Sequence, residues 1–226
     1  MPLPARIGRL RLPVLCFIVS PAAMKDSEID KVVAEAVAGG VAMVQLRDRE
    51  MPGGELLDLA RRLKRVVRGK ALLIINDRID LAIAADADGI QLPENGLPTL
   101  VSRGLIGKYA VIGRSVHSPD AASQAGREGA DFVIAGTIYK SPSKPEVKPA
   151  GLSLITEIVK STTLPVMAVG GVTAERVGDV VKAGAAGVAV ISAIAKAEDP
   201  KSAAEGLATA LKEAWTARAE KLSASA

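Results

Sequence analysis

Residues 164–192 read LPVMAVGGVTAERVGDVVKAGAAGVAVIS, and this stretch decides the fold. Two short apolar runs, 165–169 and 187–191, flank an amphipathic segment at 174–182. Short continuous apolar runs are typical of strands buried on both faces of a parallel sheet, whereas the segment between them has the periodicity of a helix. The stretch therefore predicts one strand–helix–strand unit of a parallel α/β fold.

The same alternation extends along the whole chain. Small-residue segments precede every second apolar run, roughly 45–55 residues apart, although the preference for glycine at helix ends explains part of this repeat. Strand number and length favour a single-domain (β/α)8 TIM barrel over a doubly wound sheet. The predicted strands are 14–19, 41–46, 72–75, 89–92, 110–112, 132–135, 165–169 and 187–191, with helical segments such as 30–38, 55–67, 119–128, 150–159 and 174–182 between them.

The chain is expected to form one domain over residues 1–226, with the barrel at about 12–212. The stretch from about 216 to 226 is rich in Ala, Lys, Glu and Ser and is expected to fray. Arginines before the run 14–19 resemble the start of a secretory signal, but the run is short and fits a buried strand better. A cytoplasmic location is therefore expected.

The composition excludes several classes of protein. Hydrophobic residues make up 49% and charged residues 24% of the 226 residues, which rules out disorder. The single cysteine excludes an intrachain disulfide, and the single histidine, His117, excludes a His-rich zinc site. Aromatic residues are 2%, so a base-stacking nucleic-acid surface is not expected, and no apolar run is long enough to span a bilayer. The net charge of +4 favours an anionic ligand.

The active site of such a barrel lies at the carboxyl ends of the strands. Polar residues or glycines follow nearly every predicted strand, where packing alone would not select them. The candidates are Gln45, Arg47, Arg49, Asn76, Asp77, Gln91, Ser115, His117, Ser141, Ser143, Lys144, Gly170, Gly171 and Ser192.

Gly170 and Gly171 lie between a predicted strand and a helix, where main-chain N–H groups bind phosphate well. The loops after the last two strands are the usual phosphate site of these barrels, and Ser192 opens the last of them. The alternative interpretation is a plain glycine turn followed by a threonine cap.

Arg47 and Arg49 alternate along an extended segment, so both guanidinium groups can face one polyanion such as pyrophosphate. The alternative is a surface salt bridge to a neighbouring acid. Asp77 offers one carboxylate, which together with substrate phosphate oxygens is a common way to hold Mg²⁺. The alternative is that Asp77 caps the following helix.

Histidine is the residue type most often used for proton transfer, so His117 is a candidate general acid or base, although a histidine at a helix entry is the plainer interpretation. The long segment 136–150 is a candidate binding loop that carries Ser141, Ser143 and Lys144. The basic stretch 61–70 surrounds an apolar stripe and fits a solvated helix face better than a nucleic-acid patch.

Several motifs in fixed order resemble thiamine phosphate synthase and the related TenI-like thiazole tautomerases. They are VQLR at 44–47, INDRIDLA at 75–82, GRSVHS at 113–118, AVGGV at 168–172 and GVAVISAI at 187–194, and the resemblance covers about residues 12–212.

This resemblance implies a reaction in which pyrophosphate, bound to Mg²⁺, departs from a hydroxymethylpyrimidine. The nitrogen of a thiazole phosphate or thiazole carboxylate phosphate then captures the resulting cation. It assigns pyrophosphate and Mg²⁺ contacts to Arg47, Arg49, Asn76, Asp77, Ser115 and Lys144. It assigns the thiazole phosphate site to Ser141, Ser143, Gly171, Ile191 and Ser192, and a pyrimidine contact to Gln45.

Two positions depart from the family pattern. Synthases usually carry His at position 91 and an acidic metal ligand at position 96, whereas this chain has Gln91 and Gly96. The loss of one carboxylate is expected to weaken a Mg²⁺ site, unless Glu94 replaces it. Gln91 and Gly96 match the tautomerase pattern, in which the histidine matched by His117 moves a proton.

Three functions are therefore weighed. The first is the synthase, a transferase with Mg²⁺ as cofactor; the second is the tautomerase, an isomerase; the third is a non-catalytic thiazole phosphate-binding regulator. The expected partners are phosphorylated small molecules, with no nucleic acid and no membrane, and a homodimer is compatible with the sequence.

Overall fold

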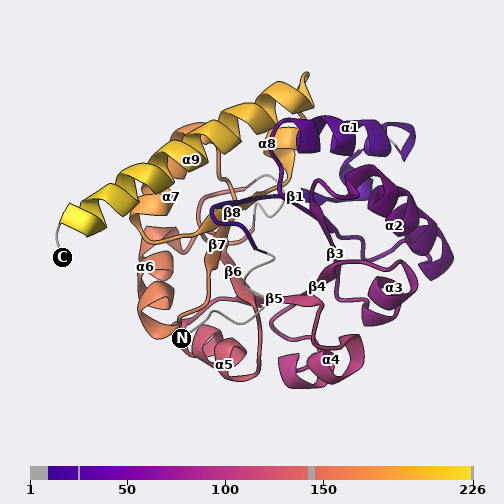
Figure 1. Cartoon of the computed structure of the whole chain (residues 1–226), viewed down its shortest axis with the longest axis horizontal. Coiled ribbons are helices and arrows are strands. Elements are labelled where there is room, and N and C mark those ends of the chain that lie inside the picture. Colours follow the sequence, from indigo (N-terminus) through magenta and orange to yellow (C-terminus); the bar gives the residue numbers. More distant parts are fainter. Residues whose placement is uncertain (1–9, 25, 142–145, 225–226) are drawn as a thin grey trace.

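A computed structural model describes residues 10–24, 26–141 and 146–224. Eight parallel strands close into a barrel in the order β1 to β8, and helices surround it (Figure 1). The prediction of a (β/α)8 TIM barrel is therefore confirmed. The strands are β1 (Val14–Val19), β2 (Met43–Leu46), β3 (Leu72–Asn76), β4 (Gly89–Leu92), β5 (Val111–Val116), β6 (Phe132–Gly136), β7 (Val166–Val169) and β8 (Gly187–Val190).

A helix follows each strand on the outside of the barrel (Figure 1). The helices are η2 (Pro21–Ala23), α1 (Asp26–Ala38), α2 (Gly53–Val67), α3 (Ile79–Ala84), α4 (Thr99–Ile106), α5 (Pro119–Arg127), α6 (Gly151–Ser161), α7 (Ala174–Lys182), α8 (Ser192–Ala195) and α9 (Pro200–Ala224). Among the described helices, none is both long and apolar enough to cross a membrane.

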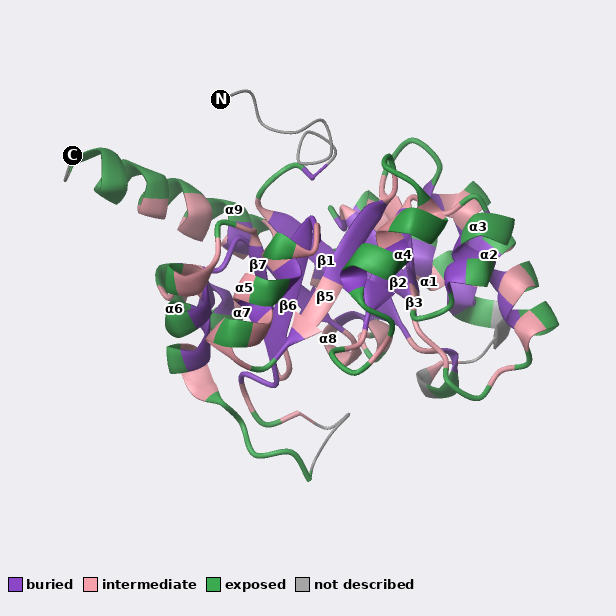
Figure 2. Ribbon diagram, turned by 90° about the horizontal axis from the view of Figure 1, so that it is seen from below, coloured by how far each residue is buried: buried purple, intermediate pink, exposed green. Residues whose placement is uncertain are grey.

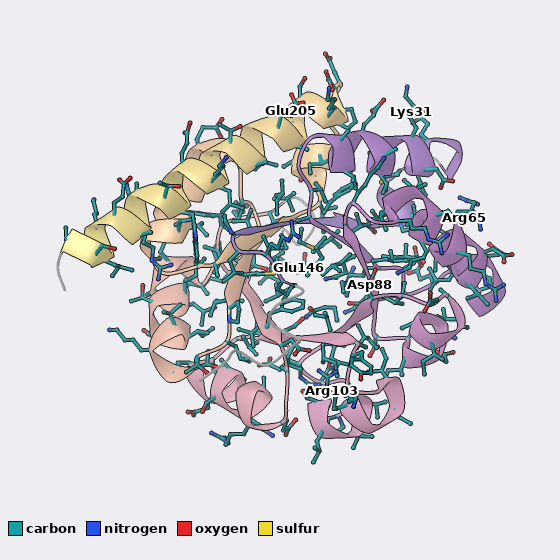
Figure 3. The ribbon with its side chains drawn as sticks, viewed as in Figure 1. Lys31, Arg65, Asp88, Arg103, Glu146 and Glu205 are labelled. Carbon is teal, nitrogen blue, oxygen red and sulfur yellow. The ribbon has the colours of Figure 1, made fainter. Side chains whose placement is uncertain are left out.

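The apolar runs form strands because both faces of each strand are buried. In β1, Leu15 and Phe17 pack outward against the helices, whereas Cys16 and Ile18 pack inward with side chains of the other strands. Side chains therefore fill the centre of the barrel, as Figure 3 shows. This filled interior leaves the carboxyl-end mouth as the place where polar groups collect.

The pairing register stacks the inward-facing residues in layers of four, each drawn from alternate strands. One layer consists of Gln45, Gln91, Ile134 and Ala189. The next layer toward the carboxyl ends consists of Ile18, Asn76, Ser115 and Val169. Polar residues thus replace apolar ones in the upper two layers, on the side of the barrel formed by β2 to β5.

The strand predicted at 110–112 is longer in the structure. β5 continues to Val116 because residues 113–116 pair with residues 132–135 of β6. Ser115 therefore lies inside the strand rather than in the loop after it. The error arose because Gly113, Arg114 and Ser115 interrupt the apolar pattern, although at the barrel mouth a strand does not need apolar side chains.

At the end of the chain, α9 continues to Ala224, and the expectation of fraying from about 216 stays a prediction. Trp215 packs against the helices around the barrel, and Arg218 donates to the carbonyl of Gly184 at 2.9 Å. These contacts hold the helix beyond residue 216. The last turns of α9 nevertheless project from the barrel and are exposed (Figure 2).

The basic stretch 61–70 belongs to α2 and to the turn that follows it. Leu59 and Leu63 are buried beneath the helix, whereas Arg65 lies at the periphery (Figure 3). Arg62 pairs with Asp30 at 3.3 Å, and Lys64 lies 2.9 Å from the carboxylate of Asp88. These contacts fit the interpretation as the solvated face of an outer helix.

Candidate active site

Two glutamine side chains form a polar floor inside the barrel mouth. Gln45 and Gln91 are 2% and 1% exposed. Gln91 Nε2 donates to Ser115 Oγ at 3.1 Å, whereas Gln45 Nε2 and Gln91 Oε1 have no partner within the described residues. Buried polar atoms are nearly always hydrogen-bonded, so this orphan donor and orphan acceptor mark a place where a ligand or ordered water completes the bonding.

Asn76 and Asp77 end β3 beside this floor. The main-chain N–H of Asp77 donates to the carbonyl of Gln91 at 2.9 Å, and its φ of 64° lies in the left-handed region, which is uncommon for a residue other than glycine. The alternative role as a helix cap is wrong, because the N-cap of α3 is Arg78, whose side chain pairs with Asp80 instead. The Asp77 carboxylate is exposed at the mouth.

Position 96 lies directly beside this carboxylate. A Cβ atom added to Gly96 would be 3.1 Å from Asp77 Oδ1. An acidic side chain at this position would begin beside Asp77, but its Cβ would also press on Pro93, so these neighbours would have to shift slightly. No three His, Cys, Asp or Glu side chains of the described segments gather into a metal site. Asp77 can therefore bind a divalent cation only if substrate oxygens supply most of the ligands.

Glu94 is engaged elsewhere. Its Oε2 lies 2.6 Å from His117 Nδ1, and its Oε1 accepts the main-chain N–H of His117 at 3.1 Å. Arg114 donates to the carbonyls of Glu94 and Leu97 and so fixes the loop that carries the acid. The structure therefore does not support Glu94 as the replacement metal ligand, because the carboxylate binds the histidine that follows β5.

A small cavity lies at the carboxyl ends of β7 and β8. Its volume is about 80 Å³, and its lining includes Thr137, Ser141, Gly170, Gly171, Ile191 and Ser192. Gly170 and Gly171 have φ values of 101° and 63°. A Cβ atom at Gly171 would also lie 2.8 Å from Tyr139 Cβ, so glycine is required both for conformation and for space. The size and lining fit a phosphate group.

The loop after β6 is fastened to this cavity. Tyr139 donates its main-chain N–H to the carbonyl of Gly170 at 3.0 Å, and Arg176 donates to the carbonyl of Gly171 at 2.7 Å while stacking over the Tyr139 ring. Ser141 is thereby brought beside the two glycines. The predicted contacts Ser143 and Lys144 lie outside the described residues.

Arg47 and Arg49 line a separate cleft of about 850 Å³, formed by the loops after β1 and β2 and by α2. In the part of the chain that the structure describes, neither guanidinium forms an ion pair, so the alternative of a salt bridge to Asp48 or Glu50 is not what the structure has. The carboxylate of Asp48 instead accepts two main-chain N–H groups. Burial and the nearby charge of Arg49 lower the pKa of Arg47, which an anion would offset.

The structure thus gathers the predicted residues into three places around the mouth. Gln45, Gln91, Ser115 and Asn76 form the floor; the glycine pair, Ser141, Ile191 and Ser192 line the small cavity; and the two arginines line the cleft. Sequence reasoning placed Arg114 among the polar residues at the end of the fifth strand but assigned it no role, and it did not select Thr137. The position of Thr137 directly after β6 was the available signal.

The chain is similar to known proteins of one family. The family profile described as "Thiamine monophosphate synthase" matches residues 15–194. The chain belongs to this family. The match runs from β1 through α8, so it includes all three places around the mouth.

Members of the thiamine monophosphate synthase family are similar over most of their length. The thiamine-phosphate synthase of Natronomonas pharaonis is 44% identical over 185 residues, which are 80% of this chain and 86% of that protein. The thiamine-phosphate synthase of Roseiflexus castenholzii is 38% identical over 208 residues, 91% of this chain and 90% of that protein. The solved structure of thiamine phosphate pyrophosphorylase from Pyrococcus furiosus is 33% identical, with a TM-score of 0.81 over 89% of this chain and 96% of that one.

Proposed function

We propose that this chain is a thiamine-phosphate synthase of thiamine biosynthesis. In the reaction, the bond between the methylene carbon of the hydroxymethylpyrimidine and its pyrophosphate breaks, and pyrophosphate leaves with the electron pair. The ring nitrogen of a thiazole phosphate forms the new C–N bond. The enzyme is then a transferase that acts on two phosphorylated small molecules.

One observation carries this choice among the candidate functions: the mouth has two separate places suited to anions. Within the described residues, the guanidinium groups of Arg47 and Arg49 form no ion pair, although acidic side chains also line their cleft. The cavity at Gly170 and Gly171 offers main-chain donors. A reaction that joins two phosphorylated substrates needs two such places. The isomerisation of thiazole carboxylate phosphate needs one phosphate site and a place for the smaller carboxylate, whereas a second site wide enough for a pyrophosphate favours the synthase.

The residues are assigned as follows. Arg47, Arg49, Asn76 and Ser115 bind the pyrophosphate of the pyrimidine substrate, as Lys144 does if the loop follows the family pattern. Ser141, Ser143, Gly170, Gly171, Ile191 and Ser192 bind the thiazole phosphate. The unpaired Gln45 Nε2 and the amide of Gln91 line the space where the pyrimidine ring would lie.

Mg²⁺ is the proposed cofactor, and Asp77 is the residue that would hold it together with pyrophosphate oxygens. When bound, the ion would neutralise the negative charge that builds up on the leaving pyrophosphate. The chain's own cations at Arg47 and Arg49 act on the same charge. They therefore compensate in part for the missing acid at position 96.

A product assay tests the proposal. The purified chain is incubated with hydroxymethylpyrimidine pyrophosphate, a thiazole phosphate and Mg²⁺, and each component is omitted in turn. We expect thiamine phosphate and pyrophosphate in equal amounts, and only when all components are present. If the thiazole phosphate binds but no thiamine phosphate forms, the proposal is wrong, and the chain is either the tautomerase or the predicted non-catalytic regulator.

The second candidate is a thiazole tautomerase, and the pairing of Glu94 with His117 favours it. A carboxylate on Nδ1 leaves Nε2 to exchange a proton with a ligand. The same assay with thiazole carboxylate phosphate alone separates the two functions. Isomerisation without Mg²⁺ and without the pyrimidine identifies the tautomerase.

A homodimer and a cytoplasmic location stay predictions, which light scattering and cell fractionation would check.

A further inference from the structure

We propose that Gln91 is a positioning residue that directs the hydroxyl proton of Ser115 toward the pyrophosphate. The inference rests on the proposed function, because it deepens the role of the pyrophosphate subsite. Its basis is the hydrogen bond from Gln91 Nε2 to Ser115 Oγ at 3.1 Å, which joins two adjacent layers of the barrel interior.

The direction of this hydrogen bond decides where the serine proton goes. A serine hydroxyl has one proton and two acceptor lone pairs. When the amide N–H donates to Oγ, the hydroxyl keeps its own proton for another acceptor. Ser115 is half-buried in the interior layer above the amide, on the side of the mouth where the pyrophosphate oxygens are proposed to lie.

The orientation of the amide follows from its surroundings. Gln91 Nε2 also faces the carbonyl oxygen of Leu92 at 3.4 Å. If the amide were turned over, its oxygen would face that carbonyl oxygen, which is unfavourable. The local environment therefore selects the orientation in which Gln91 donates to the serine.

The space around the amide fixes its position. Gly113 lies against Gln91 Oε1 and the ring of Phe132, and a Cβ atom at Gly113 would overlap both. Gly113 thus opens the room that the buried amide occupies, and the ring of Phe132 lies against the same glycine. A residue held in this way keeps its hydrogen bond before the substrate arrives, which is the condition for a positioning role.

A purely structural role does not explain a glutamine here. Gln91 is 1% exposed and its Oε1 has no partner within the described residues, so the amide is buried at a cost to stability. An apolar side chain of the same length would avoid that cost. We therefore expect Gln91→Met to leave the melting temperature unchanged or to raise it, while it weakens the binding of pyrophosphate.

The experiment is a double-mutant cycle on the full chain. The binding of inorganic pyrophosphate in the presence of Mg²⁺ is measured by isothermal titration calorimetry. Gln91→Met and Ser115→Ala are each expected to weaken binding by about tenfold, the range of a hydrogen bond to a charged group. The double variant should bind no more weakly than Ser115→Ala, because Gln91 acts through the serine. Glu157→Met, which introduces the same side chain on the exposed face of α6, is the control and should bind like wild type.

Steady-state kinetics give a second measurement. The KM for the pyrimidine pyrophosphate should rise in Gln91→Met, whereas the KM for the thiazole phosphate should not change, which a general loss of structure would not produce. If the losses from Gln91→Met and Ser115→Ala simply add, the inference is overturned while the proposed function stands. If the wild-type chain binds no pyrophosphate and forms no thiamine phosphate, it is the proposed function that has failed.

Discussion

Glu94 holds His117 at two points, with Oε2 at 2.6 Å from the ring Nδ1 and Oε1 at 3.1 Å from the main-chain nitrogen. The acid comes from the loop after β4 and the histidine from the residue after β5, so the contact ties two neighbouring strand ends together. It also removes Glu94 from the surroundings of Asp77. This contact therefore argues against Glu94 as a ligand of Mg²⁺. It also gives His117, the candidate acid or base, a carboxylate partner.

His117→Ala is predicted to abolish proton transfer on the thiazole if the chain is a tautomerase, because positioned acid–base groups contribute about 10²- to 10⁴-fold to rate. Glu94→Gln should lower the isomerisation rate less, since the glutamine amide can still hydrogen-bond to His117 although the negative charge is lost. Isomerisation is followed by NMR of the thiazole carboxylate phosphate, and Glu128→Gln is the control. An unchanged rate in His117→Ala would remove this histidine as the acid or base.

Gly96→Asp is predicted to lower the Mg²⁺ concentration that gives half-maximal synthase activity. The new carboxylate would lie beside Asp77, and affinity for divalent cations rises with the number of charged ligands. Gly96→Asn has nearly the same shape without the charge and serves as the control. Asp77→Ala should abolish turnover in the wild-type background, and full activity in that variant would contradict a metal role for Asp77.

Gly171→Ala is predicted to raise the KM for the thiazole phosphate and to destabilise the loop after β7. Its φ of 63° is strained for alanine by about 1–3 kcal/mol, and the added methyl group would press on Tyr139. Gly178→Ala on α7 is the matched control, because nothing lies within 4 Å of its new methyl group and alanine favours a helix. Calorimetry should show the melting temperature falling in the first variant and not in the second.

Arg47→Met is predicted to raise the KM for the pyrimidine pyrophosphate by roughly 10- to 100-fold, the effect of one hydrogen bond from a charged group. The KM for the thiazole phosphate should hardly change, because that phosphate is proposed to bind in the cavity at β7 and β8. Arg65→Met on the outer face of α2 makes the same change in charge and should leave both constants as they are. Equal effects of the two substitutions would show that net charge, rather than the cleft, binds the pyrophosphate.

Cys16 is predicted to be unreactive toward thiol reagents at pH 8 in the folded protein. It is buried in the barrel interior, and this burial raises the pKa of its thiol to about 12, so almost no thiolate is present. Reaction with a disulfide reagent should be complete in denaturant and negligible in buffer. Because the unfolded thiol ionises near pH 9 while the buried one does not, the free energy of unfolding should fall as the pH rises above that value. Rapid reaction of the native protein would contradict this burial.

Among these features, the barrel itself was determined by the sequence alone. A strand buried on both faces needs apolar residues at every position, so runs such as 14–19 and 132–135 are visible without any knowledge of their partners. The glycine pair at 170–171 was visible for a similar reason, because a turn with positive φ values restricts the residue type locally. The order of strands and helices then placed these two glycines at the carboxyl end of the barrel.

The tertiary structure decided which polar side chains meet. The sequence left open whether Asp77 caps a helix and whether Glu94 replaces the acid missing at position 96. Both depend on contacts between residues from different strands, as do the bonds from Glu94 to His117 and from Gln91 to Ser115. The pattern of apolar residues and glycines along the sequence indicates the burial and backbone conformation of one segment at a time. The distances across a barrel mouth depend instead on how eight strands stagger and pack together.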